Sequence, residues 1–190
     1  MNTRFTVLSG LVLCVASLAL SADPLALLLD AETSHATFTL GSTLHTVHGE
    51  MPIIRGTLHF DPEGGEASGE VVLDARSAVT GNKKRDKKMH KDVLKSAVFP
   101  QLVFRLDRIE GTLPSEGSGE LELFGSLELL GVVHEVAIPA TVSRSGNAIE
   151  GHGAVSIPYV SWGLEDPSVF VMRADKVVEV ELDVRGDLGR

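Results

Sequence analysis

Cysteine is almost absent from this 190-residue chain, which contains only Cys14. An intrachain disulfide therefore cannot form, and a cysteine-rich zinc site is excluded. Aromatic residues make up only 5% of the sequence, and the 17 basic residues are outnumbered by 26 acidic ones, which gives a formal net charge of −9. An acidic chain of this kind is not expected to bind nucleic acid, because nucleic-acid-binding proteins are normally basic.

Long apolar runs are also scarce, since the only one extends from Phe5 to Leu20. A multi-pass membrane protein is therefore excluded. The run follows the single charge of Arg4 and ends at the small residues of Ala19–Ser21, a pattern typical of a secretory signal peptide and its cleavage site. We predict that residues 1–22 are a signal peptide and that residues 23–190 form one domain in the periplasm or outside the cell. An uncleaved membrane anchor is the alternative.

Glycine is plentiful, with 19 residues, and apolar and polar side chains alternate through most of the chain. Alternation with a period of two is typical of strands with one buried face. Turn-forming clusters such as Asp61–Gly65 separate the alternating segments. About eight antiparallel strands with short connections predict an all-β meander, which closes into a barrel without free edges; a two-sheet sandwich is the alternative. The segments are 36–40, 57–60, 70–74, 101–107, 120–124, 135–142, 148–157 and 177–185.

One segment, Lys83–Lys95, interrupts this pattern with seven basic residues against the two acidic residues Asp86 and Asp92. Met89 and Val93 lie four residues apart and form a narrow apolar stripe, which predicts one short charged helix that crosses the barrel with this stripe inward. The helix then either covers one end of the core as a solvated element or forms an electropositive rim. Such a rim would attract an anionic headgroup or make transient contact with a membrane surface.

Several motifs resemble those of the YceI-like family, in the same order along the chain. The segment Thr80–His90 is similar to the family signature that begins with Thr-Gly and continues into Arg-Asp. Ser96–Phe104 resembles the family stretch with an aromatic residue before proline, and Ser34–Phe38 resembles its opening strand with His and Ser exchanged. Gly131–Val136 is similar to a later strand pair of the family.

This resemblance implies an eight-stranded antiparallel lipocalin-like barrel that binds a polyisoprenoid or similar amphiphilic lipid in its interior. The ligand would be an isoprenoid quinone, a polyprenyl phosphate or a fatty-acid-like molecule, and the protein a carrier or store with no catalytic residues and no cofactor apart from the lipid. The resemblance also implies a homodimer. The apolar side chains expected to line such a lumen, or alternatively to fill a solid core, are Phe38, Leu40, Phe60, Met89, Phe99, Phe104, Leu121 and Leu123.

Arg85 and His90 in the basic segment are the candidates for contact with a lipid headgroup. Arginine offers a fixed fork of donors that suits phosphate or carboxylate, and Asp86 is placed to orient a neighbouring base. The alternative interpretation is that Arg85 and Asp86 form a local ion pair that holds the helix on the barrel.

Two other functions remain open at this point. One is a small metal-dependent or acid–base enzyme that uses His45, His48 and His90, although residues three apart in a strand point to opposite faces. The other is a ligand-free, stress-related module with a solid core. Trp162 lies in a loop segment and is expected to plug one end of the barrel.

Overall fold

The computed structural model describes residues 25–61 and 66–189, which form nine strands, one 3₁₀ turn and one short helical segment. The predicted signal peptide, 1–22, lies outside the described residues. The strands are β1 (Leu25–Leu29), β2 (His35–Leu40), β3 (Val47–Phe60), β4 (Glu66–Asp74), β5 (Gln101–Gly111), β6 (Gly117–Leu129), β7 (Val132–Ser145), β8 (Ala148–Ile157) and β9 (Val178–Gly189). The helical elements are the 3₁₀ turn η1 (Ala75–Ser77), the α-helix α1 (Lys83–Lys88) and the π-helical turn η2 (Met89–Val93).

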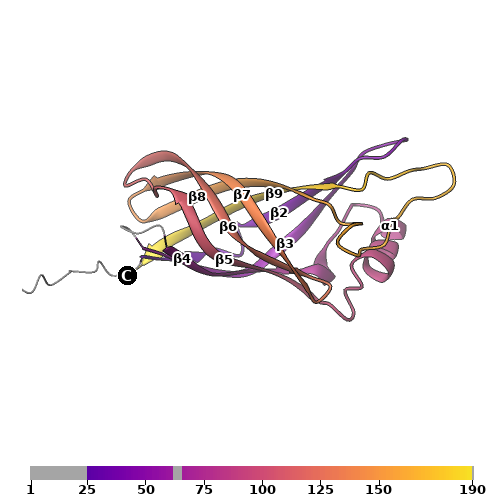
Figure 1. The fold of residues 1–190 in the computed structure, drawn as a ribbon, viewed down its shortest axis with the longest axis horizontal. Helices are drawn as coiled ribbons and strands as arrows, with labels where there is room; N and C mark the ends of the chain where they lie inside the picture. Colours follow the sequence, from indigo (N-terminus) through magenta and orange to yellow (C-terminus); the bar gives the residue numbers. More distant parts are fainter. Residues whose placement is uncertain (1–24, 62–65, 190) are drawn as a thin grey trace, which may run out of the picture.

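The nine strands occupy eight positions in one closed antiparallel barrel. Strands β3 to β9 pair in sequence order except that β9 returns to β3 through β1 and β2, each of which pairs with both neighbours. β2 pairs with the first half of β3, and β1 pairs with its second half, so the two short strands share one position in the wall. The predicted eight-stranded barrel is therefore confirmed, and Figure 1 shows its long axis horizontal.

A tight turn at Asp30–Ser34 separates these two short strands. The backbone N–H of Asp30 donates to the carbonyl of Arg185 on β9 at 2.8 Å, and the Ser34 hydroxyl accepts a hydrogen bond from the Arg185 N–H at 2.9 Å. The Asp30 carboxylate accepts hydrogen bonds from the Glu32 N–H and the Thr33 hydroxyl, and these bonds lower its pKa. Hydrogen bonds to β9 thus hold the chain where the wall is interrupted.

Alternation directs one face of each strand to the barrel interior. In β8, for example, Ile149 and Ile157 are buried while Ala154 between them is exposed. In β3 an inward position is occupied by Gly49, where an added Cβ would lie only 2.1 Å from the ring of Phe38 on β2. The glycine therefore provides the space in which the Phe38 ring lies.

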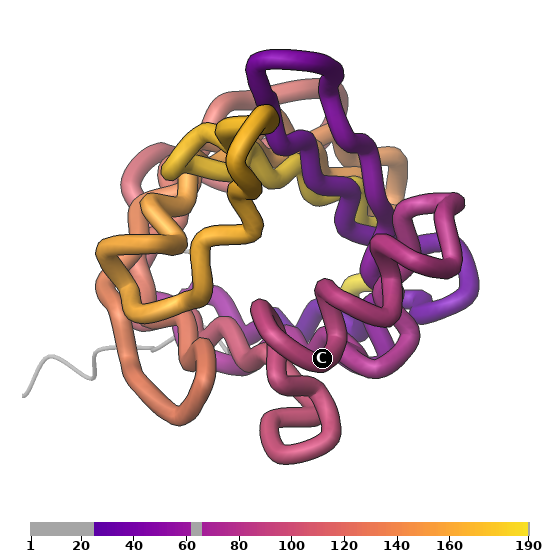
Figure 2. Tube along the Cα trace, turned by 90° about the vertical axis from the view of Figure 1, so that its right-hand side faces the viewer, coloured from indigo at the N-terminus to yellow at the C-terminus, as the bar shows by residue number. Residues whose placement is uncertain are grey.

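The helical segment lies at one end of the barrel, as Figure 1 shows. Asn82 caps α1 by accepting hydrogen bonds from the Lys84 and Arg85 backbone N–H groups at 3.1 and 3.2 Å. Met89 packs against the main core, and Val93 packs against a second cluster of buried residues at this end. The predicted short charged helix and its inward apolar stripe are confirmed. Figure 2 looks onto this end and shows the helix, the β2–β3 hairpin and the loop before β9 around the rim of the ring of strands.

Candidate ligand cavity

The barrel encloses a cavity of about 660 Å³ that receives apolar side chains from all nine strands. The described residues therefore form a hollow barrel and not the solid core of the alternative interpretation. Of the side chains predicted to contact a ligand, eight line this cavity: Phe38, Leu40, Phe60, Arg85, Met89, Phe104, Leu121 and Leu123.

One end of the cavity, here called the deep end, is formed by Leu27, Leu29, Leu58 and Phe60. These side chains are buried, with exposed fractions of only 4% for Leu27 and 4% for Phe60. They come from β1 and the second half of β3, so regular strand pairing positions them. The deep end is apolar and screened from water.

The opposite end, here called the mouth, is identified by cavity-lining residues that are also exposed to solvent. His45 of the β2–β3 hairpin, Lys84 of α1 and Val169 of the loop before β9 have this property. The cavity therefore reaches the surface near these residues. Figure 2 shows the three segments, which are distant in sequence, around the rim of the barrel.

The charged side chains that line the cavity have one sign. Lys84, Arg85 and Lys88 line the cavity, and no aspartate or glutamate does so among the residues that the structure describes. In a chain with a formal net charge of −9, the cavity lining at this end is therefore locally basic. The arrangement favours an anionic group at the mouth and an apolar chain behind it.

Arg85 and Asp86 meet on Thr80, the residue that precedes the turn into α1. The Arg85 Nε and Nη2 atoms donate to the Thr80 hydroxyl and carbonyl oxygens at 2.7 and 2.6 Å. The Asp86 carboxylate accepts from the Thr80 hydroxyl and backbone N–H, and these bonds hold the pKa of Asp86 below its usual value. Asp86 is therefore occupied with Thr80 and does not line the cavity, whereas Arg85 both lines it and braces the start of the helix.

His90 and Phe99 also lie outside the cavity lining. Helical spacing explains the first case, because Arg85, Met89 and Val93 share the inward face and the positions of Asp86 and His90 share the next face. The His90 Nδ1 atom lies 3.1 Å from the hydroxyl of the buried Ser96. The Phe99 ring instead lies against the turn between β6 and β7, beside Gly131.

The histidines of the alternative metal-site hypothesis have separate partners. His45 is at the mouth, the His48 Nδ1 atom lies 3.1 Å from the Thr39 hydroxyl, and His90 contacts Ser96. Within residues 25–61 and 66–189, no three His, Cys, Asp or Glu side chains are grouped so that they could hold a metal ion. The geometry therefore gives no support to an enzyme built on these three histidines.

Trp162 does not line the cavity. Its ring stacks on the His134 ring, with centroids 4.1 Å apart and planes 2° from parallel, and packs against the buried cluster near the mouth. The Nε2 atom of His134 is buried without a hydrogen-bond partner in the described structure. Trp162 thus packs on His134 and is not part of the cavity lining.

The loop 165–176, here called the mouth loop, was not predicted as part of the site, yet its residues Pro167, Val169, Met172 and Ala174 line the cavity. It has no periodicity that would reveal an inward face. Only its composition of Pro, Ser and Asp marks it as a loop, and its contact with α1 arises from residues far apart in sequence.

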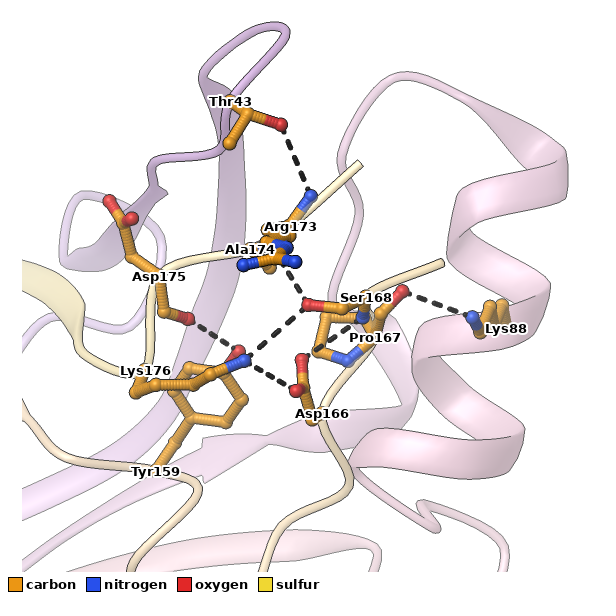
Figure 3. Close-up of polar contacts among 10 residues, drawn as sticks. All are labelled: Thr43, Lys88, Tyr159, Asp166, Pro167, Ser168, Arg173, Ala174, Asp175 and Lys176. Carbon is orange, nitrogen blue, oxygen red and sulfur yellow. Dashed lines mark hydrogen bonds and ion pairs between the residues drawn. The ribbon is translucent and has the colours of Figure 1, made fainter. Parts of the chain in front are cut away.

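Polar contacts fix the base of the mouth loop, as Figure 3 shows. Lys176 forms an ion pair with Asp166, and the Ser168 N–H donates to the same carboxylate at 3.0 Å. These bonds lower the pKa of Asp166 to about 2. The Ser168 hydroxyl accepts from the Ala174 N–H at 2.9 Å, which closes the base of the loop.

Further contacts join the mouth loop to its neighbours. Lys88 of α1 donates to the Pro167 carbonyl at 3.2 Å, and the Tyr159 hydroxyl donates to the Asp175 carbonyl at 2.7 Å (Figure 3). Burial, together with the nearby carboxylates, raises the pKa of Tyr159 to about 12, so its hydroxyl keeps its proton in neutral solution. The loop is therefore held on both sides of the opening.

Comparison with known proteins agrees with this architecture. The family model described as the YceI-like domain matches residues 28–186. The structure of BcnA from Burkholderia cenocepacia is similar, with a TM-score of 0.70 and 18% identity over 83% of this chain and 98% of that one. A polyisoprenoid binding domain from Saccharophagus degradans, implicated in plant cell wall breakdown, has a TM-score of 0.67 and 18% identity over 87% of this chain and 99% of that one. No curated protein matches the chain significantly.

Proposed function

Because this chain belongs to the YceI-like family, we propose that it is a non-enzymatic binding protein for a polyisoprenoid or a similar amphiphilic lipid. The apolar tail would occupy the deep end, and an anionic headgroup would lie among the basic residues at the mouth. The observation that carries the proposal is the cavity itself, whose charged lining side chains are all basic and all belong to the helix at its opening. The similar Saccharophagus degradans domain, described as polyisoprenoid binding, supports the same ligand class.

The energetics of such binding are favourable without any special chemistry. Each methylene removed from water contributes about 0.8 kcal/mol, so roughly 15 of them contribute about 12 kcal/mol before the cost of association is subtracted. Basic side chains at the mouth then select the headgroup more than they add affinity.

The cellular role follows from the sequence together with this site. The predicted signal peptide at residues 1–22 supports export to the periplasm or beyond, where the protein would carry or store the lipid. Within residues 25–61 and 66–189, no helix is both long and apolar enough to cross a bilayer. We further propose transient contact of Lys83–Lys95 with a membrane surface, and the homodimer stays a prediction.

The proposal is tested by mass spectrometry of an organic extract of the purified, exported protein. We expect one lipid at near-stoichiometric amount from the wild type. The variant Val155→Trp should hold clearly less of it, because this side chain lines the cavity and the larger ring would occupy part of the space for the lipid. The matched variant Ala154→Trp should retain it, because the neighbouring side chain is exposed on the outside of the same strand. Absence of lipid from the wild type, or equal lipid in the two variants, would contradict the proposal.

A further inference from the structure

The tip of the mouth loop exposes three consecutive apolar residues. Val169, Phe170 and Val171 have exposed fractions of 51%, 103% and 71%. The tip is ordered by a pair of backbone hydrogen bonds between Val169 and Met172, at 2.8 and 3.0 Å. The same turn places Val169 and Met172 against the cavity, so it has one side at the ligand site and Phe170 directed to solvent. Exposed apolar residues on a fixed turn indicate a surface that contacts a partner.

A second apolar tip lies on the neighbouring hairpin. Leu44, between β2 and β3, is 65% exposed. Its neighbour Thr43 pairs with Arg173 of the mouth loop, through Thr43 N–H to the Arg173 carbonyl at 2.9 Å and Arg173 N–H to the Thr43 hydroxyl at 3.2 Å. Figure 1 shows the hairpin and the mouth loop projecting from the same end of the barrel. The two apolar tips therefore belong to one surface.

Positive charge surrounds this surface on the side of α1. Lys83, Lys84 and Lys87 are exposed on the helix, and Lys88 connects the helix to the mouth loop. Two of the nearby carboxylates have partners within the protein, since Asp166 forms an ion pair with Lys176 and Asp86 accepts a hydrogen bond from Thr80. Glu165 and Asp175 are exposed. The lysines of α1 therefore give this end a charge that complements an anionic partner.

We propose that the mouth of the barrel docks on an anionic lipid bilayer, with Phe170 inserted at the level of the headgroups. Valine, leucine and phenylalanine side chains partition into the apolar side of the interface while adjacent lysines interact with anionic lipids. This inference rests on the proposed function and deepens it. A lipid could pass between the bilayer and the cavity without exposure of its tail to water, because the inserted tip is part of the cavity rim.

A second copy of the chain fits this surface less well. In a symmetric dimer through the mouth, the lysines of one α1 would face those of the other, and like charges in contact disfavour association. An anionic bilayer offers the opposite charge together with an apolar layer beneath it. The lysines would then lie against the anionic headgroups, and the apolar tips would enter the apolar layer.

The test is flotation of the purified, exported protein with vesicles of phosphatidylcholine and phosphatidylglycerol, and with vesicles of phosphatidylcholine alone. We expect binding to the mixed vesicles, weakened by high salt. The variant Phe170→Ser should bind about tenfold or more weakly, as expected for removal of one inserted aromatic side chain. Combined replacement of Lys83, Lys84 and Lys87 by Gln should remove the preference for the mixed vesicles, with each lysine contributing about fivefold.

A matched pair of variants separates docking from general hydrophobicity. Leu28 on β1 is also 65% exposed but belongs to the strand that forms the deep end. We expect Leu44→Ser to weaken vesicle binding and Leu28→Ser to leave it unchanged. Equal binding by wild type and Phe170→Ser would overturn the inference, and so would a concentration-dependent dimer that Phe170→Ser abolishes in light scattering.

The lipid extract distinguishes this inference from the proposed function. Phe170 does not line the cavity, so Phe170→Ser should retain its lipid while it loses vesicle binding. If wild-type protein holds lipid and Phe170→Ser still docks, only the docking inference fails. If wild-type protein docks through Phe170 but holds no lipid, only the proposed function fails.

Discussion

The two ends of this barrel are built by different means. At the deep end, continuous strand pairing positions Leu27 and Phe60, and the cavity wall is formed by buried side chains. At the mouth, three segments distant in sequence are joined by a small number of polar contacts, such as the pair between Thr43 and Arg173 and the one from Lys88 to Pro167. We therefore expect the deep end to contribute more to the free energy of unfolding than the mouth, where single contacts can open locally.

This difference matters for a protein that must hold a ligand and also release it. Apolar contact between the lipid tail and the cavity wall gives binding affinity. Exchange of the lipid requires that some part of the wall move, and the end closed by loop and helix contacts is also the end where basic side chains line the cavity. Changes at the deep end should therefore alter the free energy of unfolding, and changes at the mouth should alter selection and release.

The largest expected effect is at the deep end. Phe60→Ala should lower the free energy of unfolding by about 3–5 kcal/mol, because a buried aromatic side chain is lost from a wall that cannot collapse around the gap. Leu40→Ala, at a half-buried position near the mouth, should cost clearly less. Urea denaturation of the lipid-free protein measures both values, and equal losses would remove the distinction between the two ends.

An intermediate effect is expected at the helix. Arg85→Ala should weaken binding of an anionic lipid by about tenfold, since a charged hydrogen bond contributes more than a neutral one. A neutral lipid of equal length should bind nearly as before, measured by fluorescence competition. Arg105→Ala, which removes an exposed pair with Glu128 on the outer wall, is the control and should change neither affinity. Equal loss for both lipids would show that Arg85 acts only by bracing Thr80.

The smallest effect concerns the mouth loop in acid. Because the folded pKa of Asp166 is lowered to about 2 from its ordinary 3.8, the contribution of its bonds is complete above the ordinary value and is lost as the pH falls through the folded value. The amide resonance of Ser168 should therefore shift with a midpoint near pH 2. Asp166→Asn should abolish this transition, and a wild-type midpoint near 3.8 would contradict the ion pair with Lys176.

Most strands of the barrel could be predicted from the alternation of apolar and polar residues, and strand β1 is the exception. Strand β1 has the sequence Leu-Ala-Leu-Leu-Leu, which lacks a polar face, so its period of two is invisible although Leu28 points to solvent. The basic helix was predictable because Met89 and Val93 are four residues apart. Neighbouring positions on the same helix were not distinguished, and for that reason Asp86 and His90 were grouped with Arg85.

The mouth loop could not be predicted for a different reason. Its position depends on contacts with Thr43 and Lys88, which are distant in sequence, and no local pattern encodes such contacts. Phe99 illustrates the same limit, because its aromatic character suggested the lumen while the turn at Gly131 provides its packing partner. Local periodicity predicts the wall, whereas the rim depends on tertiary contacts.

The turn at Asp30–Ser34 divides one strand position of the wall between two short strands, β2 and β1. β2 lies against the mouth half of β3, and β1 lies against its deep half, with no continuous ladder from one short strand to the other. Local unfolding that begins at the rim and releases β2 therefore reaches a boundary at Ser34, where side-chain bonds to Arg185 anchor the chain again. We therefore expect local opening at the rim to leave the pairing of β1 with β3 and β9 intact.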